Sequence, residues 1–146
     1  MNRANHLPGK ILILSGVRGD TRRYRSLHLF EQLNILNTKV EVSHITHPKI
    51  AQQVEEADVV IFHRTAYDKF VDYLIKKIEK NNGIILSDID DYIFDPNAFQ
   101  WIDSPEFKNP IRVKLYKEEM ERFRAMLEIS SGILASTKFL ANVVQQ

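Results

Sequence analysis

Two short apolar runs, Lys10-Ile-Leu-Ile-Leu-Ser15 and Asp58-Val-Val-Ile-Phe-His63, decide the fold of this 146-residue chain. Neither run alternates apolar with polar residues, so each predicts a strand that is buried on both faces, as in a parallel sheet. Gly83-Ile-Ile-Leu-Ser87 and Gly132-Ile-Leu-Ala-Ser136 predict two further strands, and the alternating Lys39-Val-Glu-Val-Ser43 predicts another.

Amphipathic stretches lie between these runs and predict helices. They are expected from about residue 20 to residue 36 and over Pro48–Glu56, Tyr67–Asn81, Ile111–Ile129 and Lys138–Val144. Strands that alternate with helices pair in parallel through crossover helices. The sequence therefore predicts an α/β fold, a doubly wound, Rossmann-like parallel sheet with helices on both faces, formed as a single domain by residues 10–146. Residues 1–9 are expected to form a disordered tail.

Composition excludes several classes of function. The formal net charge is +1, so no global field recruits nucleic acid, and no nucleic-acid partner is expected. The chain has no cysteine, which excludes disulfides, thiolate zinc sites and thiol catalysis and agrees with a reducing, cytoplasmic location. No apolar run approaches the roughly 20 residues of a membrane span, whereas peripheral membrane contact stays open.

The candidate binding residues follow from position, because ligands of parallel sheets bind beyond the carboxyl ends of the strands. Glycines let backbone N–H groups approach a ligand, and arginine binds phosphate or carboxylate through two hydrogen bonds. The predicted substrate-binding residues are Gly16, Arg18, Gly19, Arg25, His63, Arg64, Asp88, Asp90 and Asp91. No catalytic residue is assigned. A tight turn with a solvated helix face after the first strand, and an ion pair between Arg64 and an acid of the next loop, are the alternatives.

The segment Asp88-Ile-Asp-Asp91 holds three carboxylates in four residues, and their repulsion requires a compensating charge. Three interpretations stay open: a magnesium or manganese site, an acid that binds sugar hydroxyls, or a cap or turn whose acids pair with Arg64 or Arg25. The further ligand-bearing strand that a metal phosphotransfer site needs is not apparent, so no metal is expected.

A long loop with short helical pieces is predicted from Asp88 to Pro110, where three of the five prolines lie. Four of its aromatic residues form a sequence cluster, namely Tyr92, Phe94, Phe99 and Trp101. These rings either stack on a sugar or lipid or form the packing core of the loop.

Taken in order, these segments resemble the N-terminal half of GT-B glycosyltransferases, in the broad group that includes family 4 retaining enzymes. The resemblance covers about residues 10–141. It rests on Tyr24-Arg25, Glu31-Gln-Leu33, Ala57-Asp-Val-Val-Ile-Phe-His-Arg64, Gly83-Ile-Ile-Leu-Ser-Asp-Ile-Asp-Asp-Tyr-Ile-Phe-Asp95 and Gly132-Ile-Leu-Ala-Ser-Thr-Lys-Phe-Leu-Ala141. The chain departs from the family at Asn37-Thr38, where a glycine commonly precedes the second strand, and in its arginine-rich first loop.

The resemblance implies an acceptor-binding domain that works with a second, donor-binding domain, and a sugar acceptor and a nucleotide sugar as partners. It implies no cofactor besides that donor substrate. A missing C-terminal domain and a homo-oligomer both stay open, because the last helix has an apolar side through Phe139, Leu140 and Val143. The alternative function is a non-catalytic α/β binding or regulatory module that acts through a protein partner. A receiver module would need an acidic pair after the first strand, where Arg18 and Asp20 stand.

Overall fold

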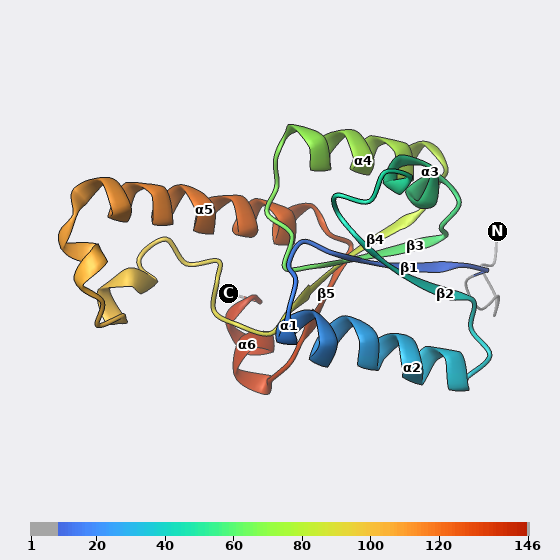
Figure 1. Cartoon of the computed structure of the whole chain (residues 1–146), viewed down its shortest axis with the longest axis horizontal. Helices are drawn as coiled ribbons and strands as arrows, with labels where there is room; N and C mark the ends of the chain where they lie inside the picture. The colour runs from blue at the N-terminus through green and yellow to red at the C-terminus, as the bar shows by residue number, and fades with distance from the viewer. Residues whose placement is uncertain (1–8, 146) are drawn as a thin grey trace.

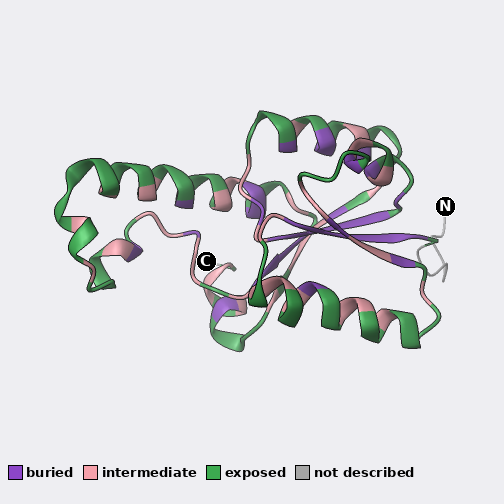
Figure 2. Ribbon diagram, in the orientation of Figure 1, coloured by how far each residue is buried: buried purple, intermediate pink, exposed green. Residues whose placement is uncertain are grey.

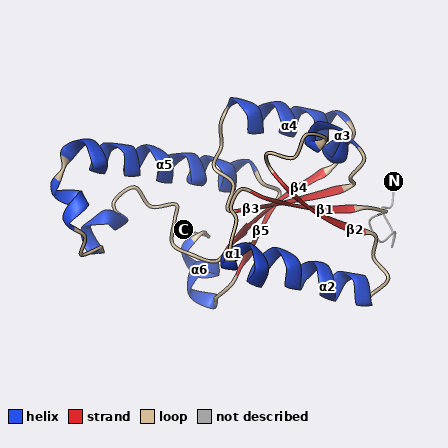
Figure 3. Cartoon of the chain, in the orientation of Figure 1, coloured by secondary structure: helices blue, strands red, loops and turns tan. Residues whose placement is uncertain are grey.

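A computed structural model describes residues 9–145 and confirms the expected parallel sheet with helices on both faces (Figure 1, Figure 3). The strands are β1 (Ile11–Ser15), β2 (Val40–His44), β3 (Val59–His63), β4 (Ile84–Ile89) and β5 (Gly132–Ala135). Their order across the sheet is β2-β1-β3-β4-β5, and every neighbouring pair is parallel. Residues 1–8 of the expected disordered tail lie outside the described part of the chain.

The helices form two layers. On one face lie α3 (Ile50–Glu55), α4 (Lys69–Lys80) and the C-terminal end of α5 (Pro110–Ile129). The opposite face is covered by one continuous helical rod that contains α1 (Asp20–Arg22), a π-helical turn η1 (Arg23–Leu27) and α2 (His28–Ile35). A last helix, α6 (Lys138–Val143), packs beside β5 and the end of α5. Figure 1 shows α2 and α6 on the side of the sheet opposite α3 and α4.

The central strands are apolar on both faces because each face is covered. Leu12, Leu14 and Phe62 pack in the layer of α3 and α4. The alternate residues Ile13 and Ile61 pack toward the rod, where α2 contributes Leu29, Phe30 and Leu33. Figure 2 shows the resulting band of buried residues along the middle of the sheet. The interpretation of the two apolar runs as strands buried on both faces is thus confirmed.

Strand β4 is longer than the sequence indicated. It was expected to end at Ser87, but its parallel ladder continues to Ile89, and the N–H of Arg64 donates to the carbonyl of Asp88 at 3.2 Å. The polar pair Ser87-Asp88 suggested a strand end, yet both residues are buried within the sheet. Asp88 therefore belongs to the strand and does not follow it.

The segment between β4 and α5 is the expected long loop with short helical pieces. It contains two 3₁₀ turns, η2 (Ala98–Trp101) and η3 (Pro105–Lys108), and with the first half of α5 it extends away from the sheet (Figure 1). Phe99 packs with Phe107 and Tyr116 inside this extension, at ring-centroid distances of 5.9 and 6.3 Å. Among residues 9–145, no helix has both the length and the apolar character that crossing a membrane requires.

Candidate functional site

A row of polar residues crosses the C-terminal edge of the sheet. The strand register pairs Ser15 with His44 and with His63, and His63 with Asp88. Residues that are paired in register point to the same face of the sheet, and so do residues two positions apart in one strand. This row therefore faces the rod, as Ile13 and Ile61 do two residues earlier in their strands. It includes the junction between β1 and β3, where the strand order reverses and where ligands of such sheets bind.

His63 and Ser15 are the most deeply buried polar residues of the row, each with 0% exposure. The Nδ1 of His63 lies 3.1 Å from the Oγ of Ser15 and 3.2 Å from the Oγ of Ser26. Its Nε2 is buried and has no hydrogen-bond partner within the described residues. Burial lowers the pKa of the imidazole and outweighs the opposing effect of the nearby carboxylates of Asp88 and Asp90. His63 is therefore neutral at neutral pH.

This lowered pKa makes the free energy of unfolding depend on pH. Below pH 6.5, the ordinary value for His, the unfolded state binds a proton that the folded state does not. The contribution of His63 to stability is therefore complete above that pH and is lost as the pH falls toward the folded pKa, with a slope of up to about 1.4 kcal/mol per pH unit. We expect chemical denaturation between pH 7.5 and 5 to show this loss, and His63→Gln to flatten the slope. The same substitution at the exposed His47 serves as the control, and an unchanged slope in His63→Gln would contradict the account.

Arg25 neutralises the buried carboxylate of Asp88. Its Nε donates to Oδ2 at 3.3 Å and its Nη2 donates to Oδ1, while the Asp88 side chain is only 2% exposed. Arg25 and the following Ser26 both reach the sheet from the π-helical turn η1, whose wider winding is frequent at functional sites. The ion pair therefore fixes the rod onto the C-terminal edge of β4.

Arg64 holds the other two carboxylates of the acidic segment. Its Nε donates to Oδ1 of Asp90 at 2.5 Å, and its Nη2 donates to Oδ2 of Asp91 at 3.1 Å. Its backbone has a φ of 43°, in the left-handed region that residues other than glycine rarely adopt. This conformation turns the chain sharply at the end of β3, beside the first loop. Such strained residues concentrate at binding sites.

The first loop fits against this turn only because residue 16 is glycine. A Cβ at Gly16 would lie 2.4 Å from the backbone oxygen of Arg64 and 3.0 Å from Thr65. We expect Gly16→Ala to lower the free energy of unfolding by about 2 kcal/mol, because one of the two backbone segments must move. Gly19→Ala is the matched control: Gly19 has a φ of 84°, but a Cβ added there would meet no atom within 4 Å, so only backbone strain is introduced. Equal losses in the two variants, measured by denaturation, would refute the close approach.

The structure brings seven of the nine predicted residues into one constellation. Arg25 pairs with Asp88, and Arg64 pairs with Asp90 and Asp91. Gly16 and His63 adjoin these two ion-paired groups. Arg18 and Gly19 are exposed and lie toward β2. The pKa of His44 on β2 is lowered mainly by burial and further by the positive charges of Arg18 and Arg22. No ion pair joins Arg18 or Arg22 to a carboxylate within residues 9–145.

The acidic segment is compensated by arginines, as one of the three open interpretations proposed. Arg25 pairs with Asp88, whereas Arg64 pairs with Asp90 and Asp91, so the three carboxylates do not converge on one point. Within the described chain, no three His, Asp or Glu side chains are grouped so that they could hold a metal ion.

Three residues of the site were missed by the sequence analysis. Ser15 and Ser26 contact His63, and the Nε of Arg22 is buried without a partner in the described structure. A signal existed for Ser15, which ends an otherwise apolar run. Nothing in the sequence marked Ser26, because its position depends on the π-helical turn. Arg22 lies in α1, just before that turn, and belongs to the arginine-rich stretch that the sequence shows.

Open hollows flank the constellation on both sides. One, of about 340 Å³, lies between the rod and the edge of the sheet and is lined by Tyr24, Arg25, His28 and Asp88, among others. A second, of about 230 Å³, is lined by Gly16, Arg64, Thr65 and residues of α4 and α5. The first hollow thus borders the ion pair of Arg25 and Asp88, and the second borders Arg64.

The fold and the site together define a single-domain, Rossmann-like α/β protein with a charged site at the C-terminal edge of its sheet. No protein-family model matches the chain, and no curated protein matches it. Among solved structures, the chain is similar to one described as a pilus assembly protein (CpaE) from Burkholderia thailandensis E264. The TM-score is 0.38 and the identity 14%, over 94% of this chain and 98% of that chain. A similarity of this strength has no bearing on function.

Proposed function

We propose that this chain is the acceptor-binding domain of a GT-B glycosyltransferase that transfers a sugar from a nucleotide sugar. One observation carries the proposal. The acidic segment on which the resemblance chiefly depends lies at the C-terminal edge of the sheet, where Arg25 and Arg64 hold it beside the β1/β3 junction. This junction is the place where ligands of such sheets bind.

The ion pairs favour an uncharged polyhydroxyl ligand at Arg64. An ionised carboxylate offers about four acceptor positions, so Asp90 and Asp91 retain capacity for sugar hydroxyl protons while each is bonded to Arg64. The side chain of Asp91 is 62% exposed and open to such a ligand. Because the positive charge of Arg64 is already matched, a phosphate gains little there. Arg18 and Arg22, which pair with no carboxylate of residues 9–145, offer the better position for an anionic group.

We expect the 146-residue chain by itself to bind an acceptor but not to turn over a nucleotide sugar. Glycosyl transfer requires stabilisation of the departing diphosphate and a fixed attack geometry, and the latter alone is worth about 7–11 kcal/mol. In GT-B enzymes the donor groups come mainly from a second domain. The test is to incubate the purified chain with a panel of UDP- and GDP-sugars plus acceptors and to measure released nucleotide. Turnover well above the uncatalysed rate would show that this one domain is a complete enzyme.

A non-catalytic module that binds a protein partner is the second candidate. It is favoured by the outer side of α6, where Phe139 is 64% exposed. Sedimentation and acceptor titration discriminate between the two functions. A partner-binding module associates with a protein and ignores sugars, whereas an acceptor domain binds sugars as a monomer.

A further inference from the structure

Three aromatic rings from separate segments meet beside the candidate site. Tyr92 follows β4, Trp101 ends η2 and Phe139 lies on α6; we call these three residues the aromatic platform. The ring centroid of Tyr92 is 6.4 Å from that of Trp101 and 6.1 Å from that of Phe139. Trp101 is 72% exposed and Phe139 is 64% exposed. Exposed apolar surface that is gathered in this way is typical of binding sites.

The packing interpretation of the aromatic cluster holds for Tyr92, Phe94 and Phe99 but not for the exposed Trp101. Phe94 is buried at 7% exposure, against the ring of Tyr92, and Phe99 packs into the extension that holds Phe107 and Tyr116. The loop therefore has its core without Trp101. The indole ring of Trp101 is therefore left on the surface, although Phe94, seven residues earlier, is buried.

Two hydrogen bonds to the carboxylate of Asp91 connect the platform to the candidate site. The Oδ1 of Asp91 accepts a hydrogen bond from the N–H of Tyr92 at 2.8 Å, and its Oδ2 accepts one from Arg64 at 3.1 Å. One carboxylate thus holds both the backbone of Tyr92 and the side chain of Arg64.

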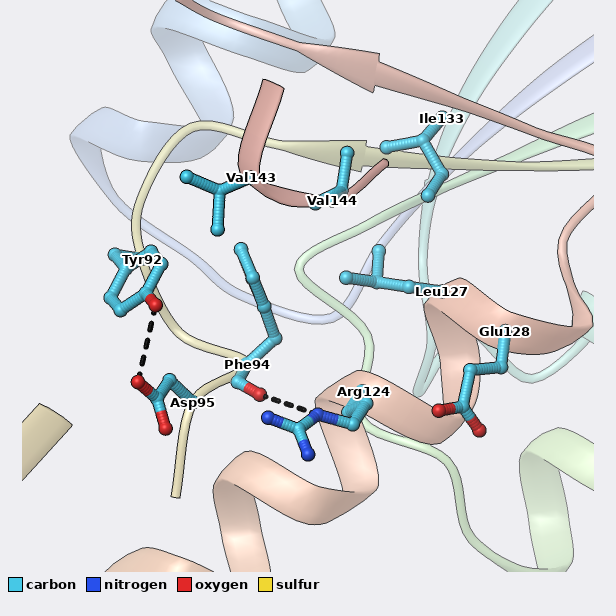
Figure 4. A pocket seen from close by; sticks show the side chains of 9 residues that line it. All are labelled: Tyr92, Phe94, Asp95, Arg124, Leu127, Glu128, Ile133, Val143 and Val144. Atoms are coloured by element: carbon cyan, nitrogen blue, oxygen red, sulfur yellow. Dashed lines mark hydrogen bonds between the residues drawn. The ribbon is translucent and has the colours of Figure 1, made fainter. Parts of the chain in front are cut away.

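A pocket of about 500 Å³ is lined in part by Tyr92 (Figure 4). Its walls include Phe94, Leu127, Ile133, Val143 and Val144, and its polar groups are the Tyr92 hydroxyl, Asp95, Arg124 and Glu128. The Tyr92 hydroxyl donates to Asp95 at 3.1 Å, and burial and this bond raise the pKa of the phenol, which stays protonated. Two carboxylates against one guanidinium make the pocket net negative.

We propose that the aromatic platform binds a sugar ring of an oligosaccharide acceptor, next to the sugar held at Arg64 and Asp91. The C–H groups of a sugar carry partial positive charge and pack on the electron-rich faces of aromatic rings. Its hydroxyls donate to carboxylates, of which Asp91 and Asp95 flank Tyr92 in the chain. The excess of carboxylates in the adjoining pocket repels an anionic lipid surface or a nucleotide. This inference rests on the proposed function for the class of ligand, and it adds the subsite.

Trp101 is the only tryptophan, so its fluorescence reports directly on the platform. We would titrate the full chain with the neutral trisaccharides maltotriose, cellotriose, mannotriose and chitotriose, and confirm affinities by calorimetry. We expect saturable fluorescence change with at least one of them, and binding about five- to tenfold weaker in Phe139→Ala and, by calorimetry, in Trp101→Ala. Phe70→Ala is the matched control. Phe70 is 45% exposed and stacks on Tyr73 on α4, so its removal should leave the affinity unchanged.

The contrary outcomes separate this inference from the proposed function. If Arg64→Ala abolishes trisaccharide binding while Trp101→Ala and Phe139→Ala leave it unchanged, the platform is not a subsite and the proposed function stands. If no trisaccharide binds, both are wrong. A fluorescence shift with phosphatidylglycerol vesicles or with rising protein concentration, and none with sugars, would assign the platform to a membrane or to a second copy and overturn the inference.

Discussion

Replacing Arg25 with alanine is expected to lower the free energy of unfolding by about 3 kcal/mol, the largest stability effect that the site offers. The substitution leaves the carboxylate of Asp88, 2% exposed, without the guanidinium that neutralises it. Burying an unpaired charge costs far more than an ion pair contributes, and Asp88 lies buried within β4, away from bulk solvent. Chemical denaturation of the wild type and the variant measures the loss.

The double variant Arg25→Ala/Asp88→Asn separates the ion pair from the lost packing. Removing both charges should restore part of the stability, and the double-mutant cycle should give a coupling energy of about 1 kcal/mol or more. Arg23→Ala, on the same turn but exposed, is the control and should change little. A loss in Arg25→Ala no greater than in Arg23→Ala would mean that Arg25 does not hold the rod to the sheet.

Replacing Arg64 with alanine is expected to weaken acceptor binding tenfold or more while affecting folding less. A hydrogen bond to a charged group contributes about 1.5–3 kcal/mol, which corresponds to about tenfold to a hundredfold in affinity. Without Arg64, the carboxylates of Asp90 and Asp91 also repel each other and lose the geometry in which they accept sugar hydroxyls. Calorimetric titration with the acceptor, next to denaturation of the same variant, compares the two effects.

Two further variants sharpen this prediction. Arg64→Lys keeps the charge but loses the planar fork that reaches two carboxylates, so it should bind with intermediate affinity. Arg112→Ala removes an exposed arginine of α5 that lines neither hollow of the site, and this variant should bind normally. If Arg64→Ala loses stability but keeps full affinity, Arg64 is a structural residue.

The strands and their parallel pairing could be predicted because Ile11–Leu14 and Val59–Phe62 are apolar on both faces, which only a covered sheet satisfies. The convergence of Arg25, Arg64 and the acidic segment followed from the rule that strand ends of a parallel sheet share one edge. The function proposed here rests on the resemblance, because composition and periodicity do not indicate one.

The partners within the site could not be predicted, because they depend on local geometry. The π-helical turn directs both Arg25 and Ser26 at the sheet, and no residue pattern announces such a turn. The sequence pattern puts Asp88 after its strand because buried carboxylates are rare and a polar residue normally ends an apolar run. The four aromatic residues lie close together in the sequence and were treated as one cluster. In the fold, Phe99 packs against Tyr116, whereas Trp101 lies beside Tyr92.

The most direct test of the account is to map acceptor binding on the labelled chain by ¹⁵N chemical-shift perturbation, with the neutral trisaccharides as titrants. The account predicts saturable shifts concentrated at the C-terminal edge of the sheet, at Gly16, at Arg64 and over Asp88–Tyr92. It predicts little change at the opposite end, around Lys10, Asp58 and Gly83. Shifts confined to that opposite end, or none with any of the sugars, would contradict the claim that this edge is an acceptor site.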